Sequence, residues 1–81
     1  MARLDIQSSE ELGRQIRELR RGQKLTQAQL AGFANTGLRF IGDLEKGKET
    51  CHIGKMLRVL SALGVELIIR DPYEKETHRD A

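Results

Sequence analysis

Residues 26–47 constrain the fold of this chain most, because they contain two short helical segments separated by a tight turn. Thr26 and Gln29 stand three positions apart as a capping-box pair, which predicts that the first of these helices begins at Thr26. Residues 35–37, Asn-Thr-Gly, predict the break, since Asn and Gly tolerate the left-handed backbone conformation. A second helix is then expected over about 38–45. The stretch therefore predicts two helices joined by a turn of about three or four residues.

Amphipathic helices are predicted on both sides of this unit. Ser8 and Glu11 form another capping-box pair, and the apolar residues that follow at helical spacing predict a helix over about 9–22. A later apolar stripe predicts a fourth helix that ends at Gly64, with these residues on its core side: Ile53, Met56, Leu57, Leu60 and Leu63. With 81 residues, 38% hydrophobic content and three aromatic residues, the chain has room for one modest aliphatic core. We therefore predict one mostly α domain.

The segment 65–70 is apolar, β-branched and too short for another helix, so it predicts a strand. The only other candidate strand is the weak piece at 4–6. Pairing with the same strand of a second copy would satisfy the backbone groups, and we expect a homodimer in which these side chains lie at the interface: Val65, Leu67, Ile68 and Ile69. Residues 1–70 are then the folded and dimerising domain, and 71–81 a polar tail that we expect to be disordered.

Charge is distributed unevenly along the chain. Residues 1–70 carry twelve basic and eight acidic residues, whereas 71–81 carry two basic and four acidic ones. A moderately basic body is compatible with an ordinary solvated surface. Clustering favours a nucleic-acid partner instead, because eight cations gather around the two-helix unit and the helix before it: Arg14, Arg17, Arg20, Arg21, Lys24, Arg39, Lys46 and Lys48.

Residue types that carry catalysis or bind metals are sparse. His52 and His78 are isolated, the single Cys51 cannot form an internal disulfide, and no metal-ligand spacing or phosphate-binding loop occurs. Cys51-His52 is more simply interpreted as the start of the fourth helix. We expect no enzyme activity, cofactor or metal, and the lack of a long apolar run predicts a cytoplasmic protein without membrane contact.

Three fragments carry a resemblance to a known family: Thr26-Gln27-x-x-Leu30-Ala31, Ile41-x-x-Leu44-Glu45-x-Gly47 and Leu63-Gly64. In this order they resemble the Cro/repressor-type (XRE) helix-turn-helix family, and residues 37–48 and 56–64 look most like HipB-type antitoxins. The resemblance implies a lambda-repressor-like four-helix domain and a homodimer with paired C-terminal strands. It also implies operator binding that represses the protein's own operon, and capture of a HipA-type Ser/Thr kinase toxin.

The chain departs from the family pattern in the turn. Asn35 and Thr36 replace the usual glycine and apolar residue, and Gly37 replaces the usual N-cap serine. Because Asn tolerates the left-handed conformation and Gly tolerates an N-cap, we expect the turn to survive at some cost in stability.

The helix at 38–45 is expected to lie in the major groove of DNA. Its outward residues Leu38, Arg39 and Asp43 are the candidates for base reading. Arg39 can donate two hydrogen bonds to guanine, and Leu38 can touch a thymine methyl group. The alternatives are an ion pair between Arg39 and Asp43 and an ordinary exposed leucine.

Phosphate contacts are expected beside this helix, from Gln27, Gly37, Phe40, Lys46 and Lys48. Gln27 could instead brace the reading helix or lie exposed, and Phe40 is also suited to packing. Glu45 is expected to form a structural ion pair with Arg20 by family register, with Arg17 as the second choice.

Three functions remain compatible with the sequence. The first is an autorepressor that is also an antitoxin. The second is a stand-alone repressor of the phage type or a restriction–modification controller, and the third is a protein-interaction module without useful DNA affinity.

Overall fold

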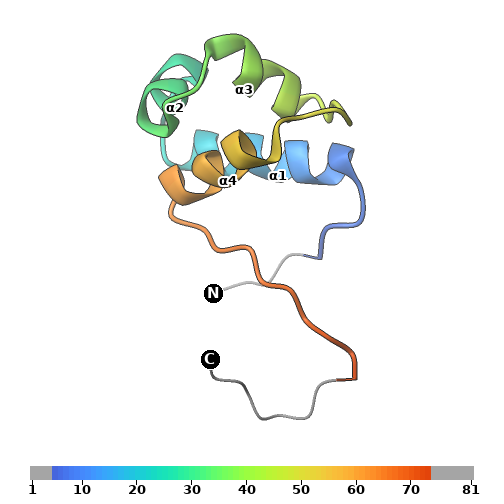
Figure 1. Ribbon diagram of the computed structural model, residues 1–81. Helices are drawn as coiled ribbons and strands as arrows, with labels where there is room; N and C mark the ends of the chain where they lie inside the picture. Colours follow the sequence, from blue (N-terminus) through green and yellow to red (C-terminus); the bar gives the residue numbers. More distant parts are fainter. Residues whose placement is uncertain (1–4, 74–81) are drawn as a thin grey trace.

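The computed structural model describes residues 5–73 and contains four helices in that range: α1 (Ser9–Gly22), α2 (Gln27–Ala34), α3 (Leu38–Glu45) and α4 (Ile53–Ala62). α2 and α3, with the turn between them, form the helix-turn-helix unit. Within the bundle, α2 packs on α3 and α4, and α1 packs on α3, so the unit contacts both α1 and α4 (Figure 1). This arrangement confirms the predicted mostly α, four-helix fold.

Side-chain caps determine where the helices begin. Thr26 Oγ1 accepts a hydrogen bond from Gln29 N at 3.0 Å, and Gln29 Oε1 accepts one from Thr26 N at 2.9 Å, so the predicted capping box of α2 is complete. Ser8 Oγ caps α1 by accepting from Glu11 N at 3.0 Å. Here the box is incomplete, because the Glu11 carboxylate accepts from Gln7 N instead.

The core takes one fully buried side chain from each helix: Ile16, Leu30, Ile41 and Val59. Burial of each contributes roughly 1.5–3 kcal/mol. Small residues of α2 and leucines of α3 and α4 complete the core around them: Ala31, Ala34, Leu44, Leu60 and Leu63. The core therefore lies where all four helices meet.

The predicted core side of α4 was wrong in two positions. Ile53 is 66% exposed and Leu57 43% exposed, whereas Val59, absent from the predicted stripe, is completely buried. The apolar residues of α4 extend around more of the helix than one face can bury, so contact with α2 decides which of them turn inward.

A close contact between α1 and the end of α3 depends on two glycines. A Cβ atom at Gly13 would lie 2.4 Å from the backbone oxygen of Leu44, a distance that no side chain can occupy. Gly47 has φ +85 and also lies against α1, and its carbonyl accepts a hydrogen bond from Ser9 Oγ at 2.9 Å. The C-terminal end of α3 is therefore held tightly against the start of α1.

The segment after α4 is extended and leaves the bundle (Figure 1). Gly64 ends the helix with φ +77, and Val65 packs against the core. Residues 66–70 are exposed, and the described chain, residues 5–73, contains no hydrogen-bonded strand. The predicted strand at 65–70 therefore has no pairing partner in the described chain, and residue 4 and residues 74–81 lie outside that range. No helix within 5–73 has the length and apolar content needed to cross a membrane.

Candidate nucleic-acid interface

α3 has a buried side and an exposed side. Ile41 and Leu44 point into the core, whereas Leu38 is 54% exposed and Arg39 is also exposed. Arg39 makes no hydrogen bond or ion pair within the described residues, so its guanidinium is available to a ligand. The alternative pairing of Arg39 with Asp43 is absent from the described residues; the Asp43 carboxylate pairs with Lys48 instead, with Oδ2 3.5 Å from Lys48 Nζ.

The turn that leads into α3 keeps the geometry that the sequence indicates. Asn35 adopts the left-handed conformation with φ 57, and Thr36 N donates to Ala31 O at 2.9 Å. Gly37 is the N-cap of α3, with extended backbone and no side-chain hydrogen bond. The start of α3 therefore lacks the cap that the other three helices have.

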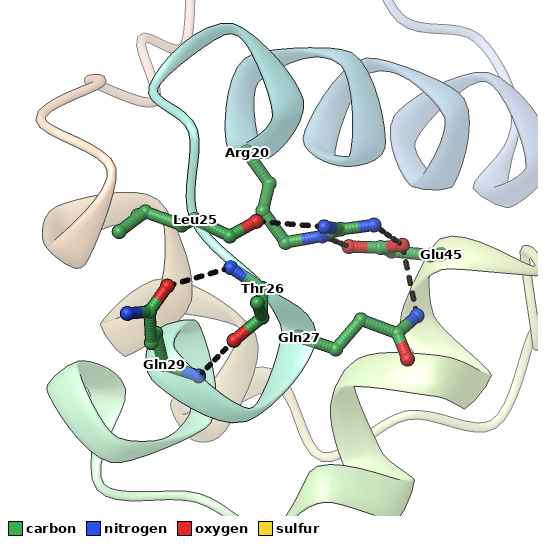
Figure 2. A network of polar contacts seen from close by, with 6 residues as sticks. All are labelled: Arg20, Leu25, Thr26, Gln27, Gln29 and Glu45. Atoms are coloured by element: carbon green, nitrogen blue, oxygen red, sulfur yellow. Dashed lines mark hydrogen bonds and ion pairs between the residues drawn. The ribbon is translucent and has the colours of Figure 1, made fainter.

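The opposite end of α3 is joined to α1 by a buried ion pair (Figure 2). Arg20 Nε donates to Glu45 Oε2 at 2.6 Å and Arg20 Nη2 to Glu45 Oε1 at 3.0 Å. The side chains are 11% and 4% exposed. Arg20 Nη1 also donates to Leu25 O at 2.8 Å. The hydrogen bond with Glu45 raises the pKa of the Arg20 guanidinium, against the lowering effect of burial.

Gln27 joins this pair from the first turn of α2. Its Nε2 donates to Glu45 Oε1 at 3.1 Å, so that the carboxylate of Glu45 accepts three hydrogen bonds (Figure 2). In this structure the Gln27 amide braces α3, as the second of its expected roles describes. The pair and its brace therefore connect α1, α2 and α3 at one point.

The remaining phosphate candidates occupy different environments. Lys46 is exposed and makes no ion pair or hydrogen bond through its side chain within the described residues. Lys48 is exposed and close to Asp43. Phe40 packs against the core, and Lys55 Nζ lies 5.8 Å from the centre of its ring, so its surroundings are those of a packing residue.

A shallow polar cleft lies between α1 and α3 next to these residues. Its lining includes three cations, the carboxylate of the ion pair, the amide of Gln27 and a glycine of α3: Arg17, Arg20, Gln27, Gly42, Glu45 and Lys46. Arg17 is exposed and makes no ion pair, since Glu45 is already paired with Arg20. The cleft therefore presents two free cations, Arg17 and Lys46, beside the exposed side of α3.

Sequence reasoning missed Arg58, which contacts the turn from α4. Its Nε donates to Ala34 O at 3.0 Å and its Nη2 to Asn35 O at 3.2 Å. The sequence indicates this contact only indirectly. α2 has no basic residue in its last turn, so its final carbonyls need a donor from elsewhere. Periodicity cannot show which distant side chain supplies it.

The described residues contain no group of three or more His, Cys, Asp or Glu side chains placed to hold a metal ion. What the site offers is a protruding helix face with an unpaired arginine, bordered by lysines. Its geometry suits contact with a polyanion whose surface carries hydrogen-bond acceptors.

Comparisons with known proteins agree on the kind of domain. Residues 11–71 match the family described as a helix-turn-helix domain. The chain is 47% identical over 70 residues to an uncharacterised HTH-type transcriptional regulator, y4mF, of Sinorhizobium fredii, covering 86% of this chain and 92% of that protein.

Solved structures show the same fold. The structure of a HipA-HipB-O2-O3 complex contains a chain that superposes with a TM-score of 0.78 at 18% identity, covering 86% of this chain and 99% of that one. The restriction-modification controller protein C.AhdI of Aeromonas hydrophila superposes with a TM-score of 0.65 at 28% identity, covering 72% and 84%. At these identities the first likeness concerns the fold alone.

Proposed function

The chain belongs to the helix-turn-helix transcriptional regulators of the XRE type, and we propose on this premise that it is a sequence-specific repressor that binds operator DNA. One observation carries the proposal: Arg39 lies unpaired on the exposed face of a helix whose other face is buried and whose far end is fixed by the Arg20–Glu45 pair. A rigidly held helix with a free guanidinium suits readout of guanine in the major groove.

In the proposed complex, Leu38, Arg39 and Asp43 face the base edges. Lys46 and Lys48 contact phosphates beyond the end of α3, and Gly37 contacts a phosphate through its backbone N–H at the start. Gln27 holds Glu45 in the free protein, so its contact with phosphate would have to use the part of its amide that Glu45 leaves free.

We further propose that the protein binds DNA as a homodimer formed through the segment 65–70. Leu67, Ile68 and Ile69 are 57%, 75% and 89% exposed, and three consecutive exposed apolar residues on an extended backbone favour covering by another strand. The two-fold symmetry would present two copies of α3 to two half-sites. Sedimentation of the wild type and of Ile68→Asp tests this: a dimer that becomes a monomer supports the interface, and a wild-type monomer rejects it.

For the biological role, we propose an antitoxin that represses its own operon and captures a HipA-type Ser/Thr kinase toxin. The support is the fold shared with a chain of the HipA-HipB-O2-O3 complex and the HipB-like sequence of residues 37–48. The likeness to C.AhdI supports a second candidate, a restriction–modification controller. Either role places the protein in the cytoplasm. Co-purification with the product of a neighbouring kinase-like gene favours the antitoxin, and a neighbouring methyltransferase or nuclease gene favours the controller.

Fluorescence anisotropy with a duplex from the protein's own upstream region tests the DNA proposal directly. A scrambled duplex of equal length and composition serves as the DNA control. Arg39→Lys serves as the matched variant, because lysine keeps the charge but cannot donate two parallel hydrogen bonds to one guanine. We expect the wild type to prefer its own duplex and Arg39→Lys to lose roughly 1–3 kcal/mol of that preference. Equal, weak binding of both duplexes by the wild type would reject sequence reading in this region and favour the protein-interaction module.

A further inference from the structure

Arg58 is an exposed residue of α4 whose guanidinium reaches out of its own helix to the helix-turn-helix unit. Two of its nitrogens donate to consecutive backbone oxygens, Nε to Ala34 O at 3.0 Å and Nη2 to Asn35 O at 3.2 Å. The planar guanidinium matches this pair of acceptors, because its donors are fixed in one fork. A flexible side chain is thereby held in one position on the turn.

The contacted carbonyls belong to the part of the unit that has least support of its own. α2 has no basic residue in its last turn to balance the partial negative charge at its C-terminus. Asn35 adopts a left-handed conformation, and Gly37 begins α3 without a side-chain cap. Local interactions therefore leave the direction in which α3 departs from the turn weakly determined.

We propose that Arg58 is a positioning residue that sets the direction of α3 at the turn, and so determines how well the unit distinguishes its operator from other DNA. The second part of this proposal, the effect on DNA discrimination, rests on the proposed function. The Arg20–Glu45 pair holds the C-terminal end of α3 against α1, and Arg58 holds the entrance to its N-terminal end against α4. The base-reading candidates Leu38 and Arg39 lie just after that entrance.

A second contact from α4 is consistent with this role. Lys55, three residues before Arg58, places its Nζ 5.8 Å from the centre of the Phe40 ring on α3. Residues three apart on a helix lie on the same side, so α4 presents two cations to the turn and the first half of α3. Of the two, only Arg58 bridges backbone acceptors on both sides of a helix end.

The variants Arg58→Lys and Arg58→Gln test the proposal, with Arg21→Gln as a matched control. Arg21 is an exposed arginine of α1 whose side chain makes no hydrogen bond or ion pair within the described residues. Anisotropy measures the Kd for the protein's own duplex and for the scrambled duplex at several salt concentrations, and circular dichroism shows that each variant is folded at the assay temperature. We expect both Arg58 variants to lose about tenfold in the ratio of the two Kd values, the size of one lost base contact. Arg21 belongs to the basic cluster, so Arg21→Gln removes a charge that attracts any DNA; we expect it to weaken binding to both duplexes to the same extent and to leave the ratio unchanged.

Two results would overturn the proposal. In the first, Arg58→Gln weakens binding to both duplexes equally and lowers the slope of log Kd against log salt by about one unit, while Arg58→Lys binds normally. That is the behaviour of a direct phosphate contact. In the second, melting falls but the ratio of Kd values does not, which is the behaviour of a residue that only stabilises the fold.

Amide hydrogen exchange keeps this test separate from the test of the proposed function. Thr36 N donates to Ala31 O inside the turn. If the wild type itself shows no preference between duplexes, the repressor proposal fails, and Arg58 is then judged on the Thr36 amide alone. Faster exchange of that amide in Arg58→Lys, with exchange in the core unchanged, supports positioning of the turn. Unchanged exchange of the Thr36 amide rejects it.

Discussion

Replacing Glu45 by Gln should destabilise the protein far more than an ordinary surface substitution does. The carboxylate accepts three hydrogen bonds, two from Arg20 and one from Gln27. A glutamine of the same shape offers one acceptor oxygen and turns an NH₂ group toward these donors. Removal of one partner of a buried ion pair costs about 3–5 kcal/mol. We expect a value near the lower end, about 3 kcal/mol, because Arg20 keeps its bond to Leu25 O and its side chain is 11% exposed.

This loss is measurable by urea and thermal denaturation at a fixed protein concentration. For a domain of this size, about 3 kcal/mol corresponds to a fall in Tm of about 12–24 °C. Glu49→Gln is the matched control, since Glu49 is exposed and makes no ion pair or hydrogen bond through its side chain within the described residues, and its change should stay within about 0.5 kcal/mol. Moderate salt should alter the difference little, because a buried pair is weakly screened. The raised pKa of Arg20 means that its contribution is lost only as the pH rises above the ordinary arginine range, so the effect should be constant from neutral to mildly alkaline pH.

The reasoning would be refuted if Glu45→Gln unfolded at the same urea concentration as Glu49→Gln. It would also be refuted if Glu45→Gln, measured well below its Tm, lost its preference for the operator while keeping wild-type stability. The first result would mean that the pair contributes no net stability, and the second that Glu45 acts in recognition.

Five further substitutions have expected outcomes. Gly13→Ala should cost about 1–3 kcal/mol or more, because its Cβ would meet a backbone oxygen at 2.4 Å, whereas Gly32→Ala, with open space around it, should stabilise α2 by about 0.5–1 kcal/mol; equal denaturation midpoints would contradict the close contact. Val59→Ala should cost roughly 2 kcal/mol or more in urea unfolding, since the side chain is completely buried, and a change below about 0.5 kcal/mol would show that α4 is misplaced. Gly42→Ala should raise the Tm through helix propensity but weaken operator binding by adding a methyl group at the cleft, and tighter binding would reject that orientation. Lys46→Ala should lower the slope of log Kd against log salt by nearly one unit, and an unchanged slope would remove Lys46 from the phosphate contacts.

Local chemistry made the helices predictable from the sequence. The capping box of Thr26 and Gln29 fixes the start of α2 whatever the rest of the chain does, and Asn35 and Gly64 end helices because their backbones adopt positive φ. These interactions span at most a few residues, so the local sequence alone is enough to predict where these helices begin and end. The same holds for Ile41 and Leu44, since residues three apart lie on the same face of a helix, and this face of α3 is the buried one.

Contacts between distant residues could not be derived in the same way. In α4 the apolar residues exceed one face, and only packing on α2 selects Val59 over Ile53. Gln27 and Arg58 both have long, flexible side chains that can reach several acceptors. Which acceptor each one finds depends on interhelical geometry that no spacing in the sequence encodes.

The separation of α3 into a buried side and an exposed side has an evolutionary consequence. Ile41 and Leu44 carry the packing, while Leu38 and Arg39 are exposed and unpaired within the described residues. If these outward residues read DNA as proposed, substitutions there would change the target without unfolding the scaffold, and related copies would diverge toward separate operators in single steps. On the same proposal, redesign of the DNA target would require exchange of only the outward residues of one helix.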